Sequence, residues 1–201
     1  MNYRLQDFIR LIIPGLYVCT IFLFCELVIK KDVFNINLIK DLSSIFILLI
    51  PFVGFVIGYF IECFMALAEH RAYKWNLPRP SRRLIKGATS YPIANLNKIT
   101  TKFHVTPDQV TNKLANEICQ EAKQSIDRGK VEDFRNNSIL ARNLLGAQLI
   151  VTIYVFCYLN EFCNTTITII LIIILFVFGR YWWHHNCVYI KYVLAEYAKI
   201  L

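Results

Sequence analysis

Four long stretches without a charged residue constrain this chain more than any other feature. They cover residues 11–25, 42–61, 143–160 and 162–179. The hydrocarbon core of a bilayer is crossed by about 20 apolar helical residues. The sequence therefore predicts an all-α integral membrane protein with four transmembrane helices, at about residues 9–29, 42–62, 143–160 and 162–180. Short connections predict that these helices pair as two hairpins.

A polar segment separates the two predicted hairpins and divides the chain into three regions. We expect a first hairpin over 1–68, a basic loop over 69–142, and a second hairpin with a helical tail over 143–201. A loop of about 70 residues is near the lower limit for burying a core of its own. We therefore expect it to pack against the membrane helices or against another copy of the chain.

The charge distribution predicts the orientation of the helices. Of the 22 Lys and Arg residues, fourteen lie in 71–142, two precede the first stretch and three follow residue 179. The connection at 30–41 holds the other three. The positive-inside rule then places both termini and the loop in the cytoplasm. Topology and anionic lipid explain the net charge of +8, so direct nucleic-acid binding is not expected.

The clearest local signal in the loop is a helix start. Thr106, Pro107 and Gln109 match a cap, a first helical position and a capping box. An apolar stripe follows at helical spacing: Val110, Leu114, Ile118, Ala122 and Ile126. The pattern predicts an amphipathic helix over about 107–127.

The apolar face of this helix must be covered by the membrane helices, by another subunit or by the membrane surface. We interpret Val110, Leu114 and Ile118 as residues that dock a partner, either a cytosolic protein or a second copy.

Two further groups of residues are candidate contact sites. Gly54 and Gly58 form a GxxxG pattern, which permits close helix packing but also occurs by chance in membrane helices. The basic cluster consists of Arg79, Arg82, Arg83 and Lys86. Prolines at 78 and 80 predict a non-helical turn there. The cluster is interpreted either as a charge anchor beside the second span or as a site for an anionic ligand, such as a lipid phosphate, a nucleotide signal or an acidic protein patch.

No catalytic signature is present, so we expect a non-enzymatic protein without cofactor or metal. His184 and His185 are adjacent and point apart on a helix, which favours a positional role at the membrane surface over metal binding. Three glutamates, Glu26, Glu62 and Glu161, lie at predicted span ends, where a role in transport is the alternative to a simple interfacial position.

The layout resembles the small multi-span effectors of bacterial anti-phage defence systems, with the 14–15 Pro-Gly entry and the 78–83 turn as supporting features. That resemblance implies an oligomerising effector that perturbs the inner membrane when its cytoplasmic region is triggered. The residues leave two alternatives open. One is a membrane scaffold that docks a cytosolic partner, and the other is a small transporter or channel subunit.

Overall fold

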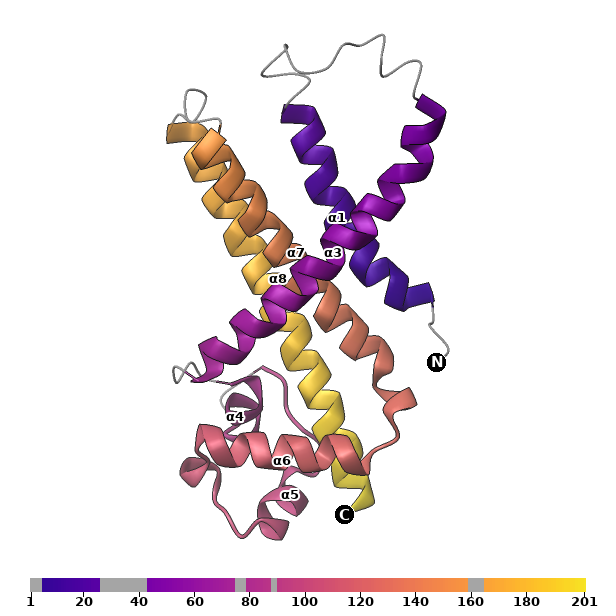
Figure 1. Cartoon of the computed structure of the whole chain (residues 1–201). Helices are drawn as coiled ribbons and strands as arrows, with labels where there is room; N and C mark the ends of the chain where they lie inside the picture. Colours follow the sequence, from indigo (N-terminus) through magenta and orange to yellow (C-terminus); the bar gives the residue numbers. More distant parts are fainter. Residues whose placement is uncertain (1–4, 26–42, 75–78, 88–89, 159–164) are drawn as a thin grey trace. The chain divides into compact units, whose positions relative to one another are not determined.

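The computed structural model describes residues 5–25, 43–74, 79–87, 90–158 and 165–201. Every regular element in these ranges is helical (Figure 1). The α-helices are α1 (Leu5–Phe24), α3 (Ser43–Lys74), α4 (Pro80–Ile85), α5 (Leu96–Lys102), α6 (Asn112–Ser125), α7 (Glu132–Tyr158) and α8 (Thr165–Ile200). Two short 3-10 turns, η2 (Pro107–Gln109) and η3 (Arg128–Lys130), flank α6. The predicted all-α class is therefore confirmed for the described residues.

Three described helices are long and apolar enough to span a membrane. The candidate spans are Leu49–Tyr73 in α3, Glu132–Cys157 in α7 and Thr165–Ile200 in α8. The apolar part of α1, Phe8–Phe24, is shorter, and residues 26–29 of the predicted first span lie outside the described residues. A membrane protein is thus supported by three helices, while the four-span count and the hairpin pairing stay predictions.

The chain divides into two compact units. The first unit comprises Met1–Ala66 and Ile139–Arg180, and the second comprises Leu67–Ser138 and Tyr181–Leu201. The helices α3, α7 and α8 each continue from one unit into the other. Compared with the three predicted regions, the C-terminal tail joins the loop instead of the second hairpin.

Glycine allows α1 and α3 to make backbone contact in the first unit. A Cβ atom added to Gly15 would lie 1.7 Å from the carbonyl oxygen of Gly54. One added to Gly58 would lie 1.8 Å from the carbonyl oxygen of Leu11. Both separations are far below van der Waals contact, so only glycine fits. The GxxxG residues therefore face α1 of the same chain, and Gly15 completes the contact.

The outer surface of the first unit is strongly apolar. Along the first part of α8, large side chains such as Ile169, Ile172 and Phe176 are exposed. A soluble surface rarely carries an apolar patch of this extent. Hydrocarbon is the environment in which such a surface is stable, and the helical backbone satisfies its own hydrogen bonds there.

The second unit has its own core, built from α4, α5, α6 and the last turns of α8. Its buried residues include Leu84, Ile99, Ile118, Val193 and Leu194. The predicted loop was too small to form a core alone, and the structure supplies the missing apolar surface from the C-terminal helix. This arrangement could not be expected from the loop sequence, because the two segments are far apart in the chain.

The structure corrects two local predictions. The segment around Pro80 is not a non-helical turn, since Pro80 occupies the first turn of α4 after Arg79 in an extended conformation. Proline has no amide hydrogen to lose at that position, so it begins a helix well. The amphipathic helix begins at 112, after the η2 turn, because Thr111 provides the cap by accepting from the amide of Leu114 at 3.2 Å.

Candidate functional site

The basic cluster lies in the second unit and is largely engaged in holding α4 against the start of α6. Arg79 donates to Oδ1 of Asn116 at 2.5 Å, within α6. Arg82 Nε donates to the carbonyl oxygen of Val110 at 3.1 Å, and Lys86 donates to that of Asp108 at 3.2 Å. Three cations thus satisfy acceptors in the segment 108–116. These contacts stabilise the packing of α4 against the segment 108–116 within the second unit.

The arginines of the cluster also lie over aromatic rings. The guanidinium carbon of Arg83 lies 5.3 Å from the ring centroid of Trp183 in α8. That of Arg79 lies 4.9 Å from the ring of Tyr73. These distances fall within the range of cation–π attraction. The structure brings the predicted cluster together, and each of its cations has a partner inside the chain. An anionic ligand would have to compete with these contacts, so its binding here stays a prediction.

The predicted docking residues face inward. Val110 is 1% exposed, Ile118 is fully buried and Leu114 is half-buried. All three pack in or against the same core as Leu84 and Leu194. The apolar face of α6 is therefore already covered by the chain itself. The predicted docking role requires the apolar face of α6 to be free. A partner of this chain would have to bind the polar face of α6 instead.

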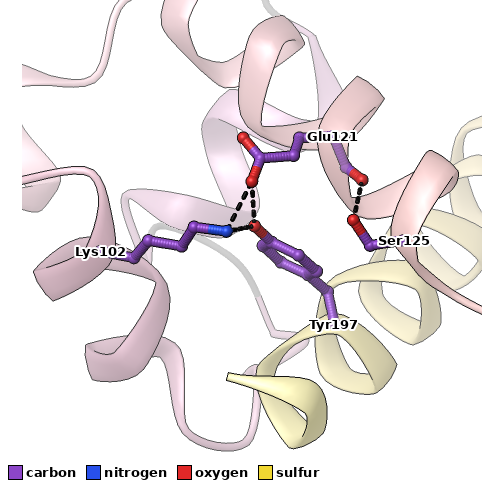
Figure 2. Close-up of polar contacts among 4 residues, drawn as sticks. All are labelled: Lys102, Glu121, Ser125 and Tyr197. Atoms are coloured by element: carbon purple, nitrogen blue, oxygen red, sulfur yellow. Dashed lines mark hydrogen bonds and ion pairs between the residues drawn. The ribbon is translucent and has the colours of Figure 1, made fainter.

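A polar network that the sequence does not reveal joins three helices of the second unit (Figure 2). Lys102 of α5 donates to Glu121 of α6 and to the hydroxyl of Tyr197 of α8, each at 2.5 Å. The same hydroxyl donates to Glu121 at 2.6 Å. Ser125 donates to the carbonyl oxygen of Glu121 at 2.9 Å. No spacing rule relates residues 102, 121 and 197, so only the fold identifies them.

The electrostatics of this network favour a tie between helices over catalysis. The hydrogen bond from Lys102 lowers the pKa of Glu121, and the hydrogen bond to Glu121 raises the pKa of Lys102. Both groups therefore remain ionised across neutral pH. A general acid or base needs a pKa near the working pH, which these opposite shifts prevent.

Buried polar side chains form a second set, inside the first unit. The Tyr17 hydroxyl of α1 donates to Oε1 of Gln148 of α7, and Gln148 Nε2 lies 3.4 Å from Oγ1 of Thr152. Asn143 donates to the carbonyl oxygen of Arg10 at 3.3 Å. Both Gln148 and Asn143 are fully buried. Sequence reasoning missed them because uncharged polar residues do not interrupt an apolar stretch.

The ionisable candidates at the span ends have mixed outcomes. Glu62 lies 3.8 Å from Arg10, and both side chains are largely shielded from solvent. Glu26 and Glu161 lie outside the described residues. In α8, His184 Nδ1 is hydrogen-bonded to the Tyr91 hydroxyl. The described residues contain no group of three His, Cys, Asp or Glu side chains arranged to hold a metal ion.

No family model, curated protein or solved structure matches this chain. The geometry defines a class: a helical protein in which three of the described helices are long and apolar enough to span a membrane, with a second compact unit rich in basic side chains.

Proposed function

We propose that this chain is a non-enzymatic membrane effector of bacterial defence, located in the inner membrane with both termini in the cytoplasm. In this proposal the second unit is the cytoplasmic control element, and the helices of the first unit perturb the bilayer on activation. Oligomers of the chain, together with the surrounding lipid, would form the active assembly.

The observation that carries the proposal is the continuity of α8. This single helix of 36 residues begins with an exposed apolar surface and ends in the core of the second unit, where Val193 and Leu194 are fully buried. A helix transmits a displacement along its length because its hydrogen bonds are all internal. A rearrangement of the second unit's core would therefore move the membrane-length part of α8, which is the coupling that a controlled effector needs.

The interior of the first unit supports the perturbing step. Gln148 and Asn143 are buried among apolar helices, where their amides bond to α1. A shift of α7 that breaks these bonds would present polar groups to hydrocarbon at a cost of several kcal/mol for each group. Amides exposed to hydrocarbon form hydrogen bonds with water or with one another, so an assembly of such helices would let water and solutes cross the bilayer.

The test is inducible expression in a bacterial host, with growth and entry of a membrane-impermeant dye as readouts, in the presence and absence of phage infection. We expect growth arrest with dye entry in infected cells. Leu194→Asp should abolish dye entry while leaving the protein in the membrane fraction. Ile200→Asp is the matched control, since Ile200 lies on the same helix but is 60% exposed. Harmless expression during infection would refute the proposal.

A small transporter or channel subunit is the second candidate, favoured by the same buried amides. It predicts solute or ion flux into liposomes that depends on Glu62, without any toxicity on induction. The scaffold alternative loses its proposed docking residues, since Val110 and Ile118 are buried. It would now be tested by whether a stoichiometric partner co-purifies and is lost when exposed α6 residues such as Lys113 and Glu117 are changed.

A further inference from the structure

A pocket of about 540 Å³ opens in the second unit, beside the end of α6. It is bounded by the last turns of α6, the η3 turn, the first turn of α7 and the middle of the C-terminal part of α8. Ligand sites for small organic molecules have volumes of roughly 300–1,000 Å³. The pocket is therefore large enough for a compact ligand, and none of the predicted site residues belongs to it.

The pocket lining carries more positively charged than negatively charged side chains. It includes Lys123, Arg128 and Arg135 against one acid, Glu132. Arg128 and Arg135 are exposed, and in the part of the chain that the structure describes neither guanidinium makes an ion pair or a side-chain hydrogen bond. The α4 cluster differs, because there every cation has an intramolecular partner. The pocket thus holds guanidinium groups that are free to bind an anion.

The rest of the lining suits a planar ring. Tyr189 is half-buried, and the Lys123 ammonium lies 5.3 Å from its ring centroid. Ile126 and Val131 are buried and supply an apolar wall. Aromatic and apolar surfaces of this kind stack well against a flat heterocycle.

Two amides belong to the same pocket lining as these apolar groups. Gln120 and Gln124 are four residues apart on α6, so both side chains lie on one helix face. An amide offers both a donor and an acceptor, which matches the edge of a nitrogen heterocycle. A simple inorganic anion would use neither the amides nor the ring.

We propose that this pocket binds a nucleotide-class ligand, meaning a soluble molecule that joins phosphate groups to a planar heterocycle. Arg128 and Arg135 hold the phosphates through charge-assisted hydrogen bonds. Tyr189 packs against the heterocycle, and the α6 amides bond to its edge. The inference concerns binding alone and does not depend on the membrane activity proposed above.

A phosphate can also come from a lipid head group or from free phosphate, and the experiment separates these sources. The full chain is purified in a neutral detergent and titrated calorimetrically with each of the four ribonucleoside triphosphates. Inorganic phosphate forms a second arm, and nanodiscs with or without phosphatidylglycerol form a third. We expect at least one nucleotide to bind more tightly than phosphate by about 10-fold or more, because stacking contributes about 1–3 kcal/mol per base.

Three variants assign the contacts. Arg128→Gln combined with Arg135→Gln should weaken nucleotide binding by about 100-fold, since each hydrogen bond between charged groups contributes about 1.5–3 kcal/mol. Tyr189→Leu should weaken nucleotide binding by about 10-fold and leave phosphate binding unchanged. Arg71→Gln removes an exposed positive charge outside the pocket lining and should leave nucleotide affinity unchanged. Helix content and thermal unfolding show that each variant is folded.

The proposal is overturned if none of the four nucleotides binds below about 1 mM, or if the double arginine variant binds as tightly as the native chain. Equal losses in the pocket and Arg71 variants would reveal non-specific charge attraction and overturn it as well. Equal affinity for nucleotide and inorganic phosphate, or binding only to phosphatidylglycerol, would likewise remove the nucleotide assignment.

Discussion

Replacement of Ile118 by alanine tests whether α6 belongs to the core of the second unit. Ile118 has no exposed surface and packs in the cluster that includes Leu84 and Val193. If α6 used this face to dock a separate partner, the free chain would tolerate the change. If the face is core, the free chain must lose stability.

The magnitude follows from the carbon atoms removed. Isoleucine has three more side-chain carbons than alanine, and each buried methylene contributes about 0.8 kcal/mol. The transfer term is therefore about 2.4 kcal/mol, and the remaining cavity adds to it, giving about 3–4 kcal/mol within the range of about 2–5 found for such substitutions. A small domain has a total stability of only about 5–15 kcal/mol, so the loss is a large share.

The assay is amide hydrogen exchange of the full chain in detergent micelles, read at the amides of α6. A loss of about 3 kcal/mol predicts exchange about 100-fold faster for amides that exchange through opening of the second unit. Glu117→Ala changes the adjacent, exposed residue of the same helix and should shift stability by less than about 0.5 kcal/mol. If Ile118→Ala exchanges at the same rate as Glu117→Ala, this face of α6 is not part of the core.

Three more outcomes are expected. Gly58→Leu forces a side chain into the backbone contact between α1 and α3 and should lower detergent-denaturation stability by about 3 kcal/mol, whereas Gly179→Leu, with nothing within 4 Å of its added Cβ, should not. The ionised Glu121 carboxylate stabilises the folded state through this network. Its contribution to the free energy of unfolding is fully present above the pKa that Glu121 has in the unfolded chain, and it is lost as the pH falls through the lower pKa of the folded state. Acid melting curves should therefore show a loss that Glu121→Gln removes, while the raised pKa of Lys102 extends the same tie to higher pH. Gln148→Leu leaves the Tyr17 hydroxyl of α1 and the Thr152 hydroxyl of α7 without their amide partner and should cost about 1 kcal/mol in the same denaturation assay.

Local sequence rules predicted the helices well where one physical signal dominated. The described parts of the long uncharged stretches, 43–61, 143–158 and 165–179, lie within α3, α7 and α8, because a bilayer-length apolar run has few alternatives to a helix. The stripe of Ile118 and its neighbours also follows the expected helical period.

Local rules failed where the same residues satisfy two conformations. Pro80 fits both a turn and the first turn of a helix, and the contacts of α4 with α6 favour the helix. Both Thr106 and Thr111 are suitable caps, and the α-helix starts at the second one, because Val110 turns inward to the core at the point between them.

The sequence by itself determined the helical class, the membrane-length apolar segments and the basic character of the polar region, since these depend on composition and short-range periodicity. Only the tertiary structure decided that the C-terminal helix completes the core of the loop and that Lys102, Glu121 and Tyr197 meet. It also decided which basic side chains are hydrogen-bonded within the chain, such as Arg82, and which line an open pocket, such as Arg128. The physical reason is that packing joins residues far apart in the chain, and no local pattern records which distant surface will cover which.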